Sequence, residues 1–390
     1  MTDGGSASSE RSEDEPRAWG WVAHLREGGT TPWADWSGAA ERGGRFLPGA
    51  QQLELVRRLN LATGGSVDQA LAMRVLEASA PGRGRPDLQL VGAARESAFG
   101  PRPVDPADLP ADELVRVATS VIAEDVAGAG LPAERPAPLT RPWRRPYRLV
   151  GDPVLADPLR AQLIARGRPP GGGGARILVL GRAVDEMLAD AFEARALDGG
   201  GPSWGDWLDV LSARDELAPR IDLAQVARTW ARRTSTERVI IVLDAHRVAR
   251  LVGVRRLAVP EPLSADAVDL ARRVAAVLGL LVTQERRAAL LQRTLAPRLR
   301  TVPGPRLAVP EPLQGWVSDR AERMRRQLRR GGYPVLGSGG KAPEERTGGV
   351  LDAVLPAYAP GGVEHVGHEG VLRVAIDLVL GPPRRPEETT

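Results

Sequence analysis

Residues 149–163 read LVGDPVLADPLRAQL, and this stretch is the clearest indication of the fold class. A short apolar run ends at Gly151, a small polar loop follows, and an amphipathic helical pattern then begins. This is the outline of the strand–loop–helix unit that holds phosphate groups in many α/β proteins. The loop must therefore be examined for the groups that an anion requires.

The loop lacks most of those groups. A phosphate site uses free backbone N–H groups, glycines that let the backbone approach, and usually a lysine. This loop has one glycine and no lysine, and Pro153 and Pro158 each remove an N–H. Asp152 and Asp157 would repel an anion, by roughly 4 kcal/mol per pair of unit charges about 4 Å apart at an effective dielectric near 20. We predict instead that Asp157 caps a helix whose first residue is Pro158.

Outward from this stretch, apolar runs alternate with helical patterns. The runs predict strands over residues 147–151, 175–181 and 238–244, each bounded by turn residues. Such alternation is typical of a parallel sheet with helices on its faces. The predicted fold class is α/β, a three-layer parallel sheet flanked by helices, together with a helical N-terminal region.

Composition shifts along the chain predict four segments. Residues 1–17 form a polar leader that we expect to be disordered, and residues 18–130 form a helical region. Within that region Ser66 is the predicted N-cap of a helix. Residues 131–146, LPAERPAPLTRPWRRP, are a Pro/Arg-rich linker, and residues 147–390 form the α/β domain with a helical C-terminal part.

Charge and composition restrict the classes of partner. The chain has no cysteine, which removes disulfides, thiolate catalysis and zinc–cysteine sites. Net charge is +4, and the basic residues, all arginine except Lys341, are dispersed among acids, which argues against nucleic acid. No apolar run is long enough for a membrane span or a signal peptide, so we expect a cytoplasmic protein. The expected partner is a small molecule or another protein.

Two residues are candidates for binding a ligand. Arg182 follows the second predicted strand, where ligands bind in open α/β sheets, and its planar fork suits a phosphate or a carboxylate. The alternative is a salt bridge from Arg182 to Asp185 or Glu186 on the helix that follows. Gly151 is the second candidate, because a glycine there lets the backbone approach an anion.

The segment VEHVGHEG, residues 363–370, gathers His365 and His368 between Glu364 and Glu369. Two histidines three residues apart can bind one metal ion, with a carboxylate as the third ligand. No other histidine cluster supports such a site. We therefore interpret the segment as a solvated loop and predict no metal.

Two aromatic pairs share one spacing. Trp33 and Trp36 in TTPWADW, and Trp204 and Trp207 in SWGDW, lie three residues apart. On a helix this spacing puts both rings on one face, and core packing is the ordinary explanation.

The octapeptide RLAVPEPL occurs at residues 256–263 and again at 306–313. Each copy precedes a helical pattern, and proline with glutamate is typical of a helix start. We predict that both copies are helix starts rather than a duplicated binding element.

The order of these segments resembles the middle of actinobacterial sulfotransferase-like proteins. The order is carried by YRLVGDP, LRAQLIARG, ARILVLGR, SWGDWLDVL and RTWARRTSTERVIIVLD, and AVPEPLQGWVSDRAERMRRQLRRGGYPVLGS resembles their C-terminal helix and strand. The resemblance implies a sulfotransferase or P-loop-like fold. Active members of that family carry sulfate from phosphoadenosine phosphosulfate to a hydroxyl or amine.

The departures from the family pattern fall on its donor site. Active members hold the donor on a loop with lysine, glycine and threonines, and on an arginine followed about two helical turns later by a serine. Arg182 matches that arginine, but Ala189 and Asp190 stand where the serine would be. The resemblance therefore implies that the scaffold is kept without the standard donor site.

The predicted function is that of a non-catalytic binding or structural protein that uses no cofactor. The alternative is an active sulfotransferase that binds phosphoadenosine phosphosulfate, with Arg160 or Arg176 in place of the loop lysine. The sequence leaves open whether the chain is an enzyme.

Overall fold

The structure is a computed structural model, which describes residues 15–44, 46–78, 87–93, 102–131, 139–140, 145–337, 347–358 and 360–381. The predicted disordered leader lies outside the described residues except for residues 15–17. Most of the predicted linker, residues 132–138 and 141–144, lies outside them as well.

Contacts divide the chain into two compact units. The helical unit comprises Met1–Gly130, Ala276–Thr283 and Gly367–Thr390, and the α/β unit comprises Leu131–Ala275 and Gln284–Val366. The boundaries predicted from the sequence placed residues 147–390 in one domain. The contacts instead group the last helix of the chain with the helices that precede residue 131.

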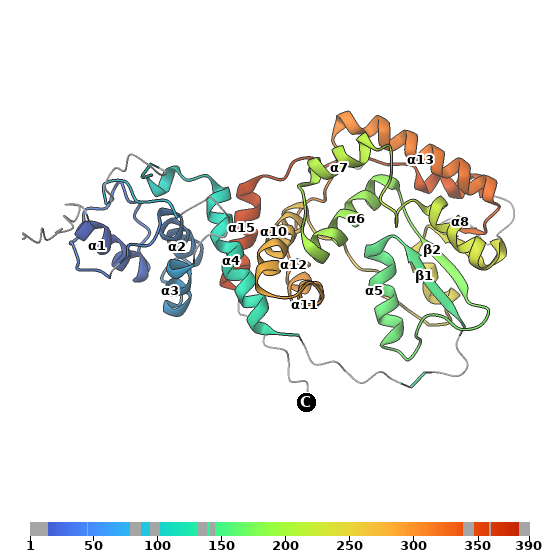
Figure 1. The fold of residues 1–390 in the computed structure, drawn as a ribbon, viewed down its shortest axis with the longest axis horizontal. Helices are drawn as coiled ribbons and strands as arrows, with labels where there is room; N and C mark the ends of the chain where they lie inside the picture. The colour runs from blue at the N-terminus through green and yellow to red at the C-terminus, as the bar shows by residue number, and fades with distance from the viewer. Residues whose placement is uncertain are drawn as a thin grey trace, which may run out of the picture. The chain divides into compact units, whose positions relative to one another are not determined.

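The helical unit is built on a pair of apolar helices. Helices α4 and α15 lie side by side in Figure 1, and each buries an apolar stripe, with Leu114 and Val121 on α4 and Leu372 on α15 among the fully or almost fully buried residues. The described elements are α1 (Glu15–Arg26), α2 (Ala50–Thr63), α3 (Gln69–Glu77), the 3-10 turn η1 (Pro106–Asp108), α4 (Ala111–Ala129) and α15 (His368–Leu380).

The N-cap predicted for α3 was wrong by two residues. The helix begins after Asp68, whose carboxylate accepts a hydrogen bond from the N–H of Leu71. The hydroxyl of Ser66 instead donates a hydrogen bond to the carbonyl of Val67. An aspartate is at least as good a cap as a serine and adds a negative charge at the positive end of the helix.

The α/β unit alternates strands with helices, as predicted. Helix α10 contributes residues 265–275 to this unit and its remaining residues to the helical unit. The elements are β1 (Tyr147–Gly151), α5 (Pro153–Ile164), β2 (Arg176–Leu180), α6 (Val184–Gly199), α7 (Trp204–Ala213), α8 (Leu223–Arg233), η2 (Thr236–Arg238), β3 (Val239–Val242), η3 (Ala245–Arg247), α9 (Val248–Leu251), α10 (Ala265–Leu281), α11 (Gln284–Leu290), the π-helical turn η4 (Leu291–Leu295), α12 (Ala296–Leu299), α13 (Glu311–Gly331), β4 (Val335–Leu336), α14 (Thr347–Val350) and η5 (Leu351–Val354).

The four described strands form one parallel sheet in the order β1-β2-β3-β4. The three strands predicted from the sequence are present, each shortened by at most two residues at an end. The carboxyl ends of these parallel strands therefore lie along one side of the sheet, and the loops after β1 and β2 are neighbours there. The general α/β class is confirmed, whereas its assignment to the sulfotransferase type is a finer prediction.

Helices cover both faces of the sheet. Figure 1 shows α5 and α8 on opposite sides of β1 and β2. On the α5 face, Leu149, Leu178 and Val242 pack with Leu159, all at most 3% exposed. Burial of both faces explains why the strands are continuous apolar runs rather than alternating ones.

The two copies of RLAVPEPL differ in structure. The second copy leads directly into α13, which begins at Glu311 with Pro312 in its first turn, as predicted. The first copy contains no helix and no strand, and α10 begins only at Ala265, two residues beyond it. The first copy instead runs beside α5, where Gln162 makes two hydrogen bonds to the backbone of Ala258.

The tryptophan pairs also differ. Trp204 and Trp207 lie on α7, are buried, and pack against Phe192, as expected for core residues. Trp33 begins a turn and Trp36 follows it, so neither lies on a helix, and their rings contact different partners, Trp21 and His24. Trp33 is buried, while Trp36 is half-buried with its ring stacked on His24 at 4.3 Å between ring centroids.

None of the described helices combines the length and the apolarity that crossing a membrane requires.

Candidate functional site

The junction between β1 and α5 is where the sequence raised the possibility of an anion site. Gly151 has a φ of +98°, and a Cβ there would lie 2.2 Å from the carbonyl oxygen of Leu180. Only glycine fits this turn, because its backbone is left-handed and lies against the neighbouring strand. The glycine thus serves the close approach of two strands, and this structural role accounts for it without a ligand.

Asp152 occupies the N-terminus of α5. Its Oδ1 accepts hydrogen bonds from the N–H groups of Val154 at 3.0 Å and Leu155 at 3.3 Å, and the side chain is fully buried. These are the free N–H groups that would otherwise bind an anion. The chain therefore places its own carboxylate where a phosphate would sit.

The predicted helix start at Asp157 and Pro158 was wrong. Helix α5 begins at Pro153, and Pro158 lies inside it. Proline is well tolerated at a first helical position, where no N–H partner is needed, so Asp152 with Pro153 is an equally good start one turn earlier. Asp157 is exposed and forms a bidentate pair with Arg220 at 2.7 and 2.9 Å, as well as a contact with Arg160.

Arg182 lies just beyond the carboxyl end of β2, as predicted, and its guanidinium is surrounded by acids. It contacts Asp152 at 3.3 Å, Glu186 at 3.4 Å and Asp190 at 2.9 Å. Of the two salt-bridge partners predicted for it, Glu186 is present, whereas Asp185 accepts a hydrogen bond from the N–H of Tyr358. Burial opposes the charge of Arg182, but these carboxylates outweigh it and raise its pKa. Nε and Nη1 donate to Asp152 and Glu186, whereas Nη2 makes no hydrogen bond within the described residues.

Asp190 is the centre of this cluster. It is fully buried on α6 between Arg182 and Arg306, whose Nη2 lies 2.6 Å from its Oδ1. Burial raises the pKa of Asp190 well above its ordinary value, and the nearby charge of Asp152 raises it further. The two arginines oppose this shift without cancelling it.

We refer to Asp152, Arg182, Glu186, Asp190 and Arg306 as the junction cluster. With every group ionised it holds two positive and three negative charges, a net charge of −1. Uptake of one proton by Asp190 would make it neutral. In either state an incoming anion meets no excess of positive charge.

The sequence points to only part of this cluster, namely Asp152, Arg182 and Glu186. In the sequence, Arg306 is only the first residue of a repeated octapeptide, and Asp190 is only a departure from a family pattern. A usable signal was present on α6, where Glu186, Asp190 and Glu193 recur at intervals of four and three residues and so share one helix face. Glu193 is buried there and accepts a hydrogen bond from the N–H of Leu263 at 2.8 Å.

A cavity of about 580 Å³ lies beside β1 on the same side of the junction as Asp157. Gly151, Arg160, Arg220 and Trp230 are among the residues that line it. Both arginines are paired with Asp157, leaving this group with one positive charge in excess. Arg176 is the other arginine that the alternative function proposes. It is the exposed first residue of β2 and so lies at the amino end of the strands, away from the junction.

The histidine segment does not form a loop throughout. His368 is the first residue of α15 in the helical unit, where its Nδ1 lies 3.8 Å from Asp112, while His365 belongs to the α/β unit. Among the residues that the structure describes, no group of three or more His, Asp or Glu side chains is arranged to hold a metal ion.

Comparison with known proteins gives no further identification: no protein family, no curated protein and no solved structure matches the chain. The resemblance to sulfotransferase-like proteins therefore stays a prediction. The geometry of the α/β unit has to carry any functional conclusion.

Proposed function

We propose that this protein is a sulfotransferase-like binding or structural protein without catalytic activity, whose phosphate position is closed by its own side chain. The observation that carries the proposal is the carboxylate of Asp152, which uses the first N–H groups of α5 from a fully buried position. A phosphate could bind there only if it displaced a carboxylate that is also in contact with Arg182.

The charge of the junction cluster supports the same conclusion. An arginine recognises phosphate by offering two parallel N–H donors, and it must be free to do so. Nε and Nη1 of Arg182 already donate to Asp152 and Glu186, while Nη2 lies 2.9 Å from Asp190 without a hydrogen bond to any described residue. The carboxylates on three sides of the guanidinium would repel an anion. To bind a phosphate, Arg182 would have to give up its contacts with Asp152, Glu186 and Asp190 at once.

Sheet topology is a further supporting feature. In open α/β sheets, ligands bind in the crevice where the strand order reverses. The described strands run β1-β2-β3-β4 without a reversal, so that crevice is absent from the described part of the sheet. The fold remains well suited to a structural or binding role that does not depend on the carboxyl edge of β1.

Isothermal titration of the full chain with phosphoadenosine phosphosulfate tests the proposal. We expect no saturable heat for the wild type. Saturable binding at micromolar concentration that Arg182→Lys weakens would contradict the proposal, because it would show that the fork of Arg182 is available. Lysine keeps the positive charge among the buried acids, and Arg176→Lys at the far edge of the sheet is the matched control.

The active-sulfotransferase alternative has one observation in its favour. Arg160 lines the cavity beside β1 together with Gly151, and that group of side chains carries an excess positive charge. If this alternative is correct, the purified chain transfers radiolabelled sulfate to a hydroxyl or amine acceptor, and Arg160→Ala removes the transfer. Our proposal instead expects no transfer to any acceptor.

A further inference from the structure

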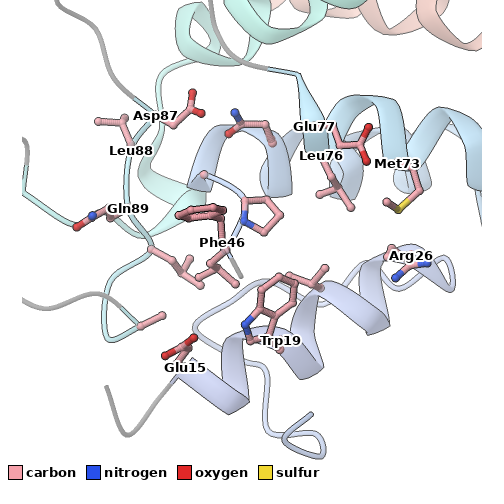
Figure 2. Close-up of a pocket in the computed structure, with 17 residues that line it drawn as sticks. Glu15, Trp19, Arg26, Phe46, Met73, Leu76, Glu77, Asp87, Leu88 and Gln89 are labelled. Carbon is pink, nitrogen blue, oxygen red and sulfur yellow. The ribbon is translucent and has the colours of Figure 1, made fainter. Parts of the chain in front are cut away.

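The helical unit contains a cavity that shares no residue with the junction cluster. Its volume is about 820 Å³, within the range of sites for small organic molecules. Helix α1 forms one side of it, and α3 with the segment around Leu88 forms the other, as Figure 2 shows. Every residue named below as lining this cavity belongs to the helical unit.

The walls of the cavity are largely apolar and include two aromatic rings. Trp19 projects from α1 and Phe46 lies across from it in the close-up (Figure 2). Met73, Leu76 and Leu88 continue the apolar lining. The Phe46 side chain is 78% exposed although it lines a cavity, so a bound molecule would bury apolar surface that water now covers.

One buried polar atom in the lining has no partner. Gln52 is 1% exposed, and its Nε2 donates to the carbonyl of Ala78 at 2.8 Å, but its Oε1 accepts no hydrogen bond. A buried acceptor of this kind is destabilising unless a donor reaches it. Gln52 is among the residues that line the cavity, so a ligand seated there lies next to this side chain.

Gly49 packs closely against this acceptor. Its φ of −68° is one that any residue adopts, so the backbone does not demand glycine there. A Cβ at this position would lie 2.4 Å from Gln52 Oε1 and 3.0 Å from the Cβ of Asp87. Any side chain at this position would clash with the oxygen, so the glycine allows the buried placement of Gln52.

Acidic groups around the cavity set the charge of the molecule it would accept. Among the described residues that line it, Glu15, Glu77 and Asp87 stand against one basic residue, Arg26, a net charge of −2 for this part of the lining. In Figure 2 Glu15 lies on the α1 side, whereas Glu77 and Asp87 lie on the other. A cation between them is attracted from both sides, and an anion is repelled.

We propose that this cavity is a binding site for an organic amine with a flat apolar body. The aromatic and aliphatic walls would take the apolar body, and the ammonium group would donate to Gln52 Oε1 with the acids around it. Rings of this kind also attract cations through their faces. The site is independent of the junction cluster, so it stands or falls separately from the proposed function.

A pair of probes that differ in charge tests the proposal. Naphthylethylamine and naphthylacetate share one apolar body, but the first carries an ammonium and the second a carboxylate at neutral pH. In isothermal titration of the full chain we expect saturable binding of the amine, at one molecule per chain, and at least about tenfold weaker binding of the carboxylate. No saturable binding of the amine, or equal affinity for both probes, overturns the proposal.

Two variants at exposed positions localise the binding without threatening the fold. Phe46→Ala is expected to weaken amine binding by about three- to tenfold, and Glu77→Gln by about two- to threefold, with the second effect reduced by salt. The matched controls are Leu61→Ala and Glu124→Gln, exposed residues of the same unit outside the cavity, and we expect wild-type affinity for both. Wild-type affinity in both cavity variants would overturn the assignment to this cavity.

Discussion

At the scale of single residues, the β1–α5 junction depends on two adjacent side chains with different tasks. Gly151 lets two strands approach, and Asp152 then turns its carboxylate onto the first N–H groups of α5. The same carboxylate neutralises part of the charge of Arg182. One aspartate therefore caps a helix and balances a buried cation, which explains a residue that is unfavourable for phosphate binding.

Gly151→Ala should destabilise the protein strongly. A Cβ would lie 2.2 Å from the carbonyl oxygen of Leu180, and the φ of +98° is strained for any other residue. We expect a loss of at least about 2 kcal/mol in the free energy of unfolding measured by chemical denaturation. Gly173→Ala is the control, because a Cβ there meets no atom within 4 Å. Equal stability of the two variants would contradict this account of the junction.

Asp190 should make stability depend on pH. Its pKa is raised in the folded state by burial and by Asp152, so the folded chain holds a proton that the unfolded chain releases near pH 3.8. The resulting stabilisation is complete below that pH and is lost as the pH rises through the raised pKa. The loss is about 1.4 kcal/mol for each pH unit that separates the folded pKa from the unfolded one.

Asp190→Asn removes this proton while keeping an oxygen for Arg306. We expect the variant to gain stability relative to the wild type as the pH rises above about 4, measured by denaturation across a pH series. Asp198→Asn, at an exposed position of the same helix, should follow the wild-type curve. A constant difference between Asp190→Asn and the wild type at all pH values would show that the wild-type pKa is not raised.

At the scale of elements, the start of helix α5 is the feature that the sequence left ambiguous. Two prolines in the stretch each offered a possible first helical residue, and the structure uses the earlier one. Pro158 consequently lies in the second turn, where it provides no N–H for the carbonyl of Val154. The helix tolerates this defect because its apolar side, including Leu159 and Leu163, is buried against the sheet.

Pro158→Ala should therefore stabilise the protein. Alanine restores one helical hydrogen bond, partly offset by the greater freedom of the unfolded chain, and we expect a gain of about 1–2 kcal/mol. Pro153→Ala, at the first helical position where no partner is available, should be neutral or lose about 0.5 kcal/mol. Thermal or chemical denaturation measures both. A loss of stability in Pro158→Ala would contradict the assigned start of α5.

At the scale of the whole molecule, segments far apart in the sequence complete each unit. Helix α15 packs on α4, although more than two hundred residues separate them, and it supplies buried Val371, Leu372 and Val374 to the helical unit. The α/β unit is interrupted in a similar way by residues 276–283. The fold of the helical unit therefore requires the last described helix of the chain.

Leu372→Ala should weaken the helical unit selectively. The side chain is 2% exposed, and its truncation should lower stability by about 2–5 kcal/mol. Hydrogen exchange should become faster in α4 and α2, while β1, β2 and β3 keep their protection. Asp377→Ala, an exposed position on the same helix, is the control and should leave exchange unchanged. Faster exchange confined to the strands would contradict the division into these two units.

The sequence by itself determined the parallel sheet and its three longer strands, because hydrophobic periodicity is a local property of adjacent residues. It also placed Arg182 at the carboxyl end of β2. Which of two prolines starts α5 was beyond it, since both satisfy the same local rule. Tertiary structure made that choice: with the earlier start, Asp152 caps α5 and also lies 3.3 Å from Arg182. The pairing of Asp190 with Arg306, 116 residues away, likewise depends on chain segments that meet only in the fold.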